Sequence, residues 1–325
     1  MYNKTWSIEE VPINGPEDLR ETIRGSDMEI VQLKPGKLQG SITHFRIGML
    51  EISAGRFSAN IRLRGSLHPE RVALATLIDS AGRMTQWWQE VQIGDVGVHP
   101  AGVEFDAIHC GDAAYLVVSI ALPELSSMLV GEDHLSDPAF WNTKRLYRTD
   151  PLIANKMPEQ LMRMLPNVER KFAAPSDQDV DFLGRSIIET FAVALGGALP
   201  REKGRSFYTG ARLVSETEDY ANAASGRPVH IFELCSALKV SRRSLHRAFA
   251  DTLGVGPVAY LRRRRLSAMR SVLKRCNPAT ISIGDLAFEY GFPEPGRCAA
   301  YYREHFGETP SETLRSRPVS TLGVN

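Results

Sequence analysis

A short basic segment near residue 245 holds the side chains that most often bind phosphates and base edges of nucleic acids. Within six residues it carries three arginines and a histidine: Arg242, Arg243, His246 and Arg247. If the neighbouring Leu245 is buried in a helix, helical spacing turns these four side chains outward. Guanidinium groups are planar and bind phosphates or guanine edges through paired hydrogen bonds. A solvated charged face is the alternative, so the surrounding elements decide.

Those elements form two helix-turn-helix patterns, over residues 230–254 and 281–307. In the first, Leu234 and Leu238 share one helix face, and Ser241 is suited to cap the helix that carries the arginines. In the second, a turn leads into a helix with an apolar stripe at i, i+4 and i+8. That stripe consists of Cys298, Tyr302 and Phe306. The context favours nucleic-acid binding over a solvated face.

A third helix is predicted between the two patterns, from Pro257 to near Leu273, because proline favours the first turn of a helix. It contains the basic run from Arg262 to Arg265. This run adds to the positive charge beside the first helix-turn-helix pattern.

These motifs resemble the DNA-binding region of the AraC/XylS family of bacterial transcription regulators. The matching residues are Ser241–Phe249, Leu253–Pro257, Tyr260-Leu261, Arg265-Leu266, Ala287, Gly291-Phe292, Tyr302, Phe306-Gly307 and Pro310. The resemblance implies an all-α domain with two helix-turn-helix units over residues 226–317. The sequence departs from the family at Cys298, where a larger apolar residue is usual, and at Pro293, Pro295 and Gly296.

The resemblance also implies the residues that contact DNA. Arg243, His246 and Arg247 match positions that reach base edges, and Arg242 matches one suited to phosphate. In the second unit, Arg297 is placed for a groove contact and Arg303 for phosphate. The full set of predicted DNA-binding residues is Arg242, Arg243, His246, Arg247, Arg262, Arg263, Arg297 and Arg303.

The partners implied are double-stranded promoter or operator DNA, RNA polymerase, a small-molecule effector and a second copy of the chain. The family implies activation more often than repression. The distribution of charge along the chain agrees with a C-terminal part that binds DNA and a separate N-terminal part that regulates it. Residues 201–325 hold 20 Lys and Arg against 12 Asp and Glu, a net of +8, whereas residues 1–200 hold 19 against 26, a net of −7.

The four cysteines are far apart, with neither zinc-site nor disulfide-framework spacing, which predicts a reducing compartment. No apolar run approaches 18 residues and no signal segment follows Met1, so a soluble, cytoplasmic protein is expected. Cys298 is interpreted as a packing residue; a redox sensor is the alternative.

Residues 41–120 read as short β-prone runs separated by turns, after one short strand near Ile30. The predicted turns include Ala54-Gly55, Gly65-Ser66, Ser80–Gly82 and Gly111-Asp112. Such a pattern predicts a jelly roll or β-barrel. Residues 94–102 resemble a strand and turn of cupin-like sensor domains in the same family, and the layout around residues 33–37 resembles regulators of the ethanolamine-operon type.

Residues 123–200 are expected to be helical, with helices at 154–165 and 179–199. The second carries a wide apolar stripe from Phe182 to Leu195, which predicts packing on the β domain, a dimer interface, or both. The predicted fold is α+β and multidomain. A cupin-like effector-sensing domain with dimerisation helices spans residues 1–200, and a linker with a first helix spans residues 201–225.

The effector prediction begins with Arg62 and Arg64, which alternate and therefore face the same side of a strand. If that side is the interior, they clamp a carboxylate or phosphate; if it is outside, they are solvated. Trp87 and Trp88, on opposite faces of a predicted strand, could stack on a ligand. The predicted effector-binding residues are Arg62, Arg64, His68, Arg71, Trp87 and Trp88. The arginines favour an anionic effector or a nucleotide second messenger. An amine is a further alternative that the sequence does not exclude.

A cupin-like metalloenzyme with a vestigial DNA-binding tail is the alternative function. Its metal ligands would come from His44, His68, His99, His109, Glu104 and Asp106. They lack the close His-x-His spacing of a metal-binding cupin strand. The sequence therefore predicts no catalytic residue, metal or cofactor, and a regulator rather than an enzyme.

Overall fold

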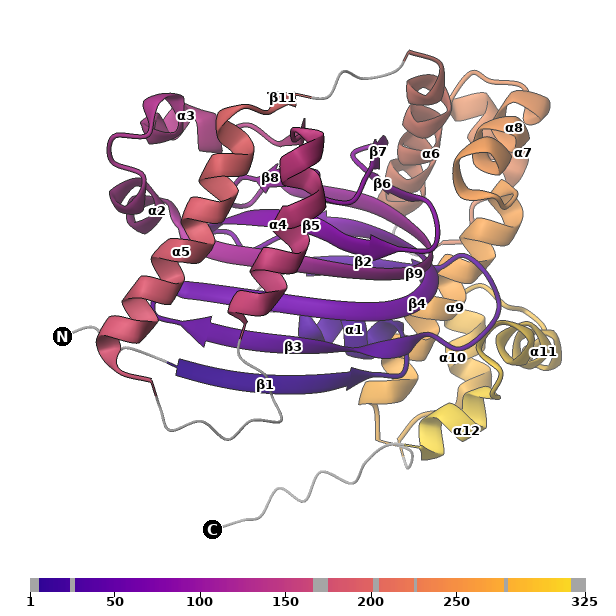
Figure 1. Ribbon diagram of the computed structural model, residues 1–325. Coiled ribbons are helices and arrows are strands. Elements are labelled where there is room, and N and C mark those ends of the chain that lie inside the picture. Colours follow the sequence, from indigo (N-terminus) through magenta and orange to yellow (C-terminus); the bar gives the residue numbers. More distant parts are fainter. Residues whose placement is uncertain are drawn as a thin grey trace, which may run out of the picture. The chain divides into compact units, whose positions relative to one another are not determined.

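The computed structural model of the chain divides into two compact units (Figure 1). It describes residues 6–23, 27–165, 175–200, 205–224, 227–277 and 280–316. The N-terminal unit comprises Met1–Ile30 and Leu38–Gly204, and the C-terminal unit comprises Val31–Lys37 and Arg205–Asn325. The sequence prediction placed its first domain boundary after residue 200, and its linker residues 201–204 lie outside the described residues. No helix among the described residues has the length and apolar character needed to cross a membrane.

The N-terminal unit is built on one sheet of 11 strands, with the order β1-β3-β4-β9-β5-β8-β10-β11. Strand β2 pairs with β4, β6 pairs with β9, and β7 pairs with β6. The strands are β1 (Trp6–Ile13), β2 (Asp27–Gln32), β3 (Gln39–Ile47), β4 (Leu50–Ser66), β5 (Arg71–Ser80), β6 (Met84–Gln86), β7 (Gln89–Val91), β8 (Val96–His99), β9 (Glu104–Ala121), β10 (Arg145–Arg148) and β11 (Leu199–Pro200). The short strand expected near Ile30 is β2, and sequence analysis missed β1.

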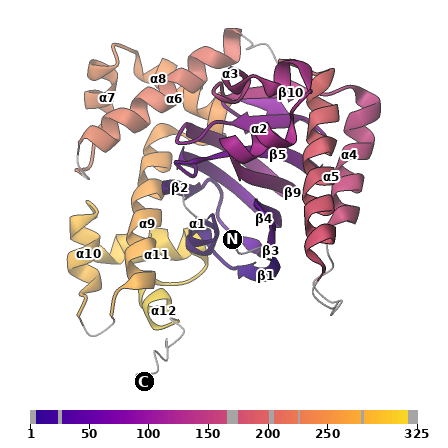
Figure 2. The same ribbon diagram turned by 90° about the vertical axis from the view of Figure 1, so that its left-hand side faces the viewer.

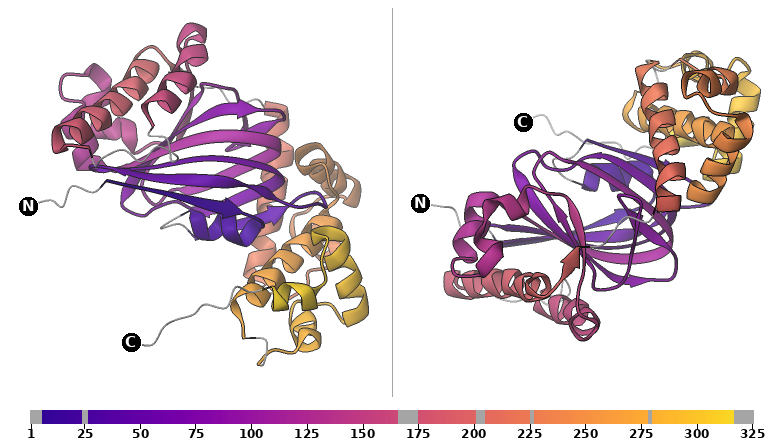
Figure 3. Two further views of the ribbon diagram at one scale, coloured as in Figure 1. Left: turned by 60° about the horizontal axis from the view of Figure 1, so that its bottom comes forward. Right: turned by 90° about the horizontal axis from the view of Figure 1, so that it is seen from above.

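Two long antiparallel strands, β4 and β9, carry the sheet and curve with it (Figure 3). Their pairing is continuous from Glu51 opposite Ser119 to Ser66 opposite Glu104. The turns predicted at Ala54-Gly55 and Gly111-Asp112 are therefore wrong, because both dipeptides lie within these strands. Neighbouring strands satisfy the backbone of β4 on both sides, which overrides the local preference of glycine for a turn.

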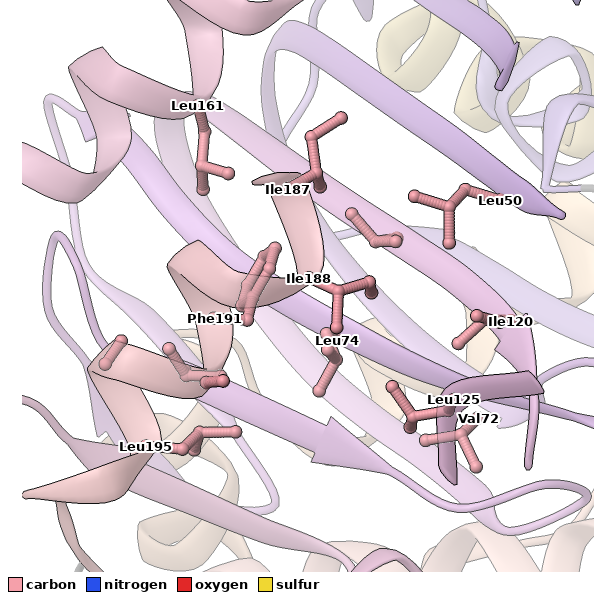
Figure 4. Close-up of a cluster of buried hydrophobic side chains, with 14 of the residues drawn as sticks. Leu50, Val72, Leu74, Ile120, Leu125, Leu161, Ile187, Ile188, Phe191 and Leu195 are labelled. Atoms are coloured by element: carbon pink, nitrogen blue, oxygen red, sulfur yellow. The ribbon is translucent and has the colours of Figure 1, made fainter. Parts of the chain in front are cut away.

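Alternating residues of the strands divide the N-terminal unit into two interiors. On β9, Leu116, Val118 and Ile120 belong to an apolar core that continues into the helices (Figure 4). The residues that alternate with them, Tyr115, Val117 and Ser119, line a cavity on the opposite side of the sheet. The helices of this unit are α1 (Pro16–Thr22), α2 (Leu122–Met128), η1 (Asp133–Ser136), α3 (Pro138–Trp141), α4 (Pro151–Met164) and α5 (Asp177–Gly196).

The helices α4 and α5 lie side by side against the sheet, as Figure 2 shows. Both confirm the predicted helical segments to within a few residues. Of the predicted stripe on α5, the residues Ile187, Ile188, Phe191 and Leu195 are buried in the core. Phe182 is 74% exposed and does not share in that packing. The stripe thus packs on the sheet over part of its length only.

The predicted strand through Trp87 and Trp88 is wrong, because these residues form the turn between β6 and β7. Both have positive φ, 47° and 65°. Tight two-residue hairpin turns need this conformation, and bulky side chains adopt it only when contacts compensate the strain. Trp87 stacks against His99 at 4.7 Å between ring centroids, and Trp88 covers the guanidinium of Arg62 at 4.5 Å.

The C-terminal unit contains the two predicted helix-turn-helix patterns and the predicted connecting helix. Its helices are α6 (Arg205–Ala223), α7 (Ile231–Ala237), α8 (Arg242–Leu253), α9 (Pro257–Arg275), α10 (Ile283–Glu289), α11 (Pro295–Phe306) and α12 (Pro310–Arg315). Ser241 caps α8 as predicted, since its hydroxyl accepts a hydrogen bond from the Ser244 amide at 3.0 Å.

The two turns close in the same way. The amide of Val240 donates to the carbonyl of Cys235 at 3.0 Å, and that of Phe292 donates to the carbonyl of Ala287 at 2.9 Å. The residue before the closing amide is left-handed in both, Lys239 with φ 54° and Gly291 with φ 73°. The repeat expected from the sequence is therefore present in the backbone even where residue types differ.

Cys298 provides a test of the packing of α11. It is 1% exposed, its sulfur lies 3.7 Å from that of Met269, and burial raises the pKa of its thiol to about 11. Only about one thiol in 10⁴ is then ionised at pH 7, and the thiolate is the reactive form. We expect iodoacetamide to label the half-buried Cys235 and Cys276 well before Cys298, measured by peptide mass spectrometry. Equal labelling rates in the folded protein would exclude a purely packing role.

Candidate functional site

The outward face of α8 presents the predicted arginines. Leu245 and Phe249 are buried, whereas Arg242, Arg243 and Arg247 are exposed. Arg247 forms a surface ion pair with Asp251 at 3.4 Å. Such exposed pairs contribute about 0–1 kcal/mol, so a phosphate or base can replace the carboxylate.

His246 departs from this arrangement. It is half-buried, its Nε2 atom is buried without a hydrogen-bond partner among the described residues, and its ring lies close to Gly256. A ring in this position must turn before it can reach a base edge. The base-contact prediction for His246 is therefore less well supported by the geometry than that for Arg243 and Arg247.

The outward face of α11 is poorer in long polar side chains. Arg297 is exposed and pairs with Glu294 at 3.2 Å, and Arg303 is also exposed. Pro295, Gly296 and Ala300 are also exposed near the helix start. This face can approach a groove closely but has few groups that distinguish one base pair from another.

The arginine run of α9 is used within the C-terminal unit. The Arg262 guanidinium lies 4.0 Å from the ring centroid of Tyr301 on α11, and Arg263 donates to the main-chain oxygen of Leu33. Arg264 donates to Asn222 of α6 at 2.7 Å. Burial lowers the pKa of the Arg263 guanidinium, which agrees with its partial enclosure. The geometry disfavours the predicted DNA contacts of Arg262 and Arg263, because these groups already have partners and are half-buried.

Arg265 completes this set of contacts. It donates to the main-chain oxygen of Gly291 at 2.8 Å and lies over the ring of Phe292 at 4.7 Å. The carbonyls of the second turn thus receive a charged donor from the connecting helix. Helix α9 thus joins the two helix-turn-helix units, and its arginines contact the elements next to it.

A cavity of about 180 Å³ lies in the N-terminal unit, on the side of the sheet away from α4 and α5. At roughly 10–15 Å³ for each water-sized position, it holds on the order of a dozen waters. Its walls are mainly apolar, and Gln86, His99 and His109 are among the polar residues that line it. Burial lowers the pKa of His99 to about 3 and that of His109 to about 4, so both rings are neutral at pH 7.

Of the predicted effector residues, His68 and Arg71 line this cavity. Arg71 donates to the main-chain oxygens of Met49 and Ser119, both at 2.8 Å, and lies 3.9 Å from Glu51. Arg62, Arg64, Trp87 and Trp88 do not belong to the lining. Their assignment to an effector is therefore not supported by the geometry.

Arg62 and Arg64 do share one side of β4, as alternation predicts, but it is the side opposite Leu63, which lines the cavity. Arg62 is nevertheless only 1% exposed. Its guanidinium forms a two-bond ion pair with the carboxylate of Asp106, with one bond at 2.9 Å, and Trp88 covers it. Neither predicted alternative, ligand clamp or solvated surface, describes this buried pair.

His99 and His109 were considered in the sequence only as metal ligands. Among the described residues, no group of three or more His, Cys, Asp or Glu side chains is arranged to hold a metal ion. The two rings instead line the cavity beside aromatic side chains. The spacing of residues in the sequence could not reveal a shared cavity. His99 lies on β8 and His109 on β9, and the two rings reach the same cavity only once these strands are assembled in the sheet.

Comparison with known proteins identifies the C-terminal unit. Residues 234–316 match the family model described as "Helix-turn-helix domain". The XylDLEGF operon transcriptional activator 1 of Pseudomonas putida is 38% identical over 96 residues, which cover 30% of this chain and 29% of that protein. The probable thc operon regulatory protein of Rhodococcus erythropolis is 35% identical over 106 residues, covering 33% of this chain and 32% of that protein.

Among solved structures, a probable AraC family transcriptional regulator from Rhodopseudomonas palustris is 34% identical, covering 33% of this chain and 99% of that one, with a TM-score of 0.30. The chain thus spans about a third of the length of the two curated relatives. The N-terminal unit lies outside the residues that the family model matches.

The buried pair of Arg62 and Asp106 gives a stability prediction. Arg62→Ala leaves the Asp106 carboxylate buried without its guanidinium, which costs about 3–5 kcal/mol in the free energy of unfolding. Replacing both residues, in Arg62→Met with Asp106→Leu, should cost much less, because no charge is left unpaired. Urea denaturation measures both values. A loss below about 1 kcal/mol for Arg62→Ala would show that the pair is not structural.

Proposed function

We propose that this chain is a sequence-specific DNA-binding regulator of the AraC/XylS family, controlled by a small molecule. The match of residues 234–316 to a helix-turn-helix family model supports the proposal, as do the relatives named as operon activators. The observation that carries the proposal is the capped helix α8, which buries Leu245 and Phe249 and presents Arg242, Arg243 and Arg247 to solvent within a helix-turn-helix unit. A recognition helix of this kind lies in the major groove and reads base edges with its exposed side chains.

Activation is the direction of control that we propose, through contact with RNA polymerase, because relatives of the C-terminal unit are named as activators. We also propose a homodimer formed through α5. Phe182 and Val193 are 74% and 58% exposed, and they stand three helical turns apart on the same side. Exposed large apolar groups aligned on one helix face suit contact with a second copy.

The effector role belongs to the N-terminal unit, and its support is the apolar cavity with a few polar groups. We keep the cupin-like jelly roll as the proposed class of this fold, because long antiparallel strands contribute residues to the lining of the cavity. A regulator rather than an enzyme is proposed for the whole chain. Metal analysis of protein purified without chelator separates the alternatives, since stoichiometric bound metal would favour the metalloenzyme.

Arg247 provides the test of base readout by α8. With a duplex selected from a random pool, Arg247→Ala should lose about 1–3 kcal/mol of binding free energy and relax selectivity at one or two base pairs. Fluorescence anisotropy with a panel of single-base variants measures both effects.

Arg212→Ala is the matched control for this experiment. Arg212 is an exposed arginine of α6 with an i,i+4 carboxylate partner, Glu216, as Arg247 has Asp251. The control should retain selectivity. If Arg247→Ala binds with wild-type affinity and selectivity, α8 does not read bases as proposed.

The two recognition helices should contribute unequally to the binding site. Because α11 exposes mainly small side chains, with Arg297 as its long groove-facing group, we expect it to respond to groove shape and backbone more than to bases. Selection from a random pool should yield one sharply defined half-site and one loose half-site, about one helical turn or 10 base pairs apart. Two equally sharp half-sites would contradict this division.

A further inference from the structure

Some polar atoms of the residues that line the cavity have hydrogen-bond partners and others do not. This difference limits which ligands the cavity can bind. Nδ1 of His99 and Nδ1 of His109 are buried and have no hydrogen-bond partner among the described residues. The two residues are 3% and 4% exposed. A buried polar atom without a partner is unfavourable, and a ligand that supplies the partner recovers that free energy.

The protonation of His99 is set by Gln86. The amide nitrogen of Gln86 lies 2.9 Å from Nε2 of His99. That amide nitrogen can only donate, so Nε2 accepts and the proton of the neutral ring is on Nδ1. The N–H of the neutral His99 ring is therefore at Nδ1, which is a buried atom. Gly97 allows this pair to form, because a Cβ there would lie 2.7 Å from the Gln86 amide nitrogen and 2.9 Å from Nε2 of His99.

The walls around the two histidines are aromatic. The ring centroids of Phe57 and His109 are 5.2 Å apart, and those of Phe105 and His99 are 5.3 Å apart. The ring centroids of Tyr115 and Phe57 are 5.5 Å apart. All five rings belong to the cavity lining. Such walls favour a flat ring, which gains contact area with little loss of conformational entropy.

The charges of the lining cancel. Its arginines are Arg46 and Arg71, and its glutamates are Glu9 and Glu51. Arg46 lies 3.3 Å from Glu51, and Arg71 lies 3.9 Å from the same carboxylate. His99 and His109 add no charge at pH 7, since burial lowers the pKa of each ring and keeps it neutral. A charged ligand would lose its hydration and gain no opposite charge beside the two Nδ1 atoms.

We propose that the cavity binds an uncharged, planar aromatic molecule bearing a carbonyl or hydroxyl group, which is hydrogen-bonded by the imidazole rings of His99 and His109. This inference rests on the proposed effector role of the N-terminal unit. It replaces the anionic effector expected from Arg62 and Arg64, which do not line the cavity.

Three probes that share one ring and differ in charge test the proposal: benzamide, benzoate and benzylamine. With the full chain at pH 7.5, benzamide should raise Tm and bind with measurable heat in calorimetry, and the two ions should bind at least tenfold more weakly. An equal or stronger response to benzoate or benzylamine would overturn the proposal. So would the lack of any response to benzamide.

Two variants locate the probe. His109→Phe keeps a ring beside Phe57 and removes an unpartnered polar atom, so the Tm of the free protein should stay or rise. Its affinity for benzamide should fall about fivefold to tenfold, the effect of one neutral hydrogen bond. Thr85→Val is the matched control, because the Thr85 hydroxyl is also buried without a partner among the described residues but does not line the cavity. It should leave the affinity unchanged, and equal losses in the two variants would overturn the assignment.

A direct measurement covers the case in which His109→Phe does not fold. In wild-type protein with ¹⁵N-labelled histidine, benzamide should shift the Nδ1 resonances of His99 and His109, and unshifted resonances would overturn the proposal. DNA binding separates this inference from the proposed function. If benzamide binds as described but never changes occupancy of the selected duplex, the cavity assignment stands and the effector role fails.

Discussion

The C-terminal unit depends on one helix, α9, whose arginines are bonded to the elements around it. Arg264 reaches Asn222 of α6, Arg265 reaches the main-chain oxygen of Gly291 in the second turn, and Arg270 lies 2.5 Å from Glu308. Burial lowers the pKa of the Arg265 guanidinium, the expected response of a cation taken out of water. The carbonyls that it meets would otherwise lack a donor, so the turn and the helix stabilise each other. Helix α6 and the second helix-turn-helix unit are thereby bonded to the same helix.

This use of arginine adds a second role to the basic run of α9. A basic run next to a recognition helix predicts phosphate contacts, yet Arg262 lies over Tyr301 and Arg265 lies over Phe292. Guanidinium groups stack on rings as readily as they bind anions, and the sequence does not distinguish these uses. The arginines of α8 are exposed, and Arg247 forms a surface ion pair with Asp251. The arginines of α8 and those of α9 differ in exposure to solvent, and this difference is known only from the folded structure.

Local patterns did predict most of the helical elements. The cap at Ser241, the start of α9 at Pro257 and the stripe from Cys298 to Phe306 all follow from spacings of a few residues, and the structure confirms them. The β domain was harder, because pairing between distant strands decides it. Gly55 lies inside β4 since β3 and β9 flank it there. Trp87 and Trp88 form a turn because their rings find His99 and Arg62, contacts that no local pattern contains.

The candidate sites divide in the same way. The α8 site was predictable because a helix carries its own geometry and resemblance supplied the roles. The cavity was not, because its polar groups come from separate strands, Gln86 from β6, His99 from β8 and His109 from β9. Burial then changes their chemistry, since rings that would titrate near neutrality in water stay uncharged. A cavity lined in this way differs from the charged clamp that alternating arginines had indicated.

The most direct test of the account is the affinity of the full chain for a selected duplex and for a scrambled duplex of the same composition, measured by anisotropy over a range of salt concentrations. Specific recognition by two linked recognition helices predicts at least about 10³-fold tighter binding to the selected duplex near physiological salt. It also predicts that both affinities fall as salt rises, because phosphate contacts release counterions. Equal affinity for the two duplexes at every salt concentration would contradict the claim that this chain reads DNA sequence.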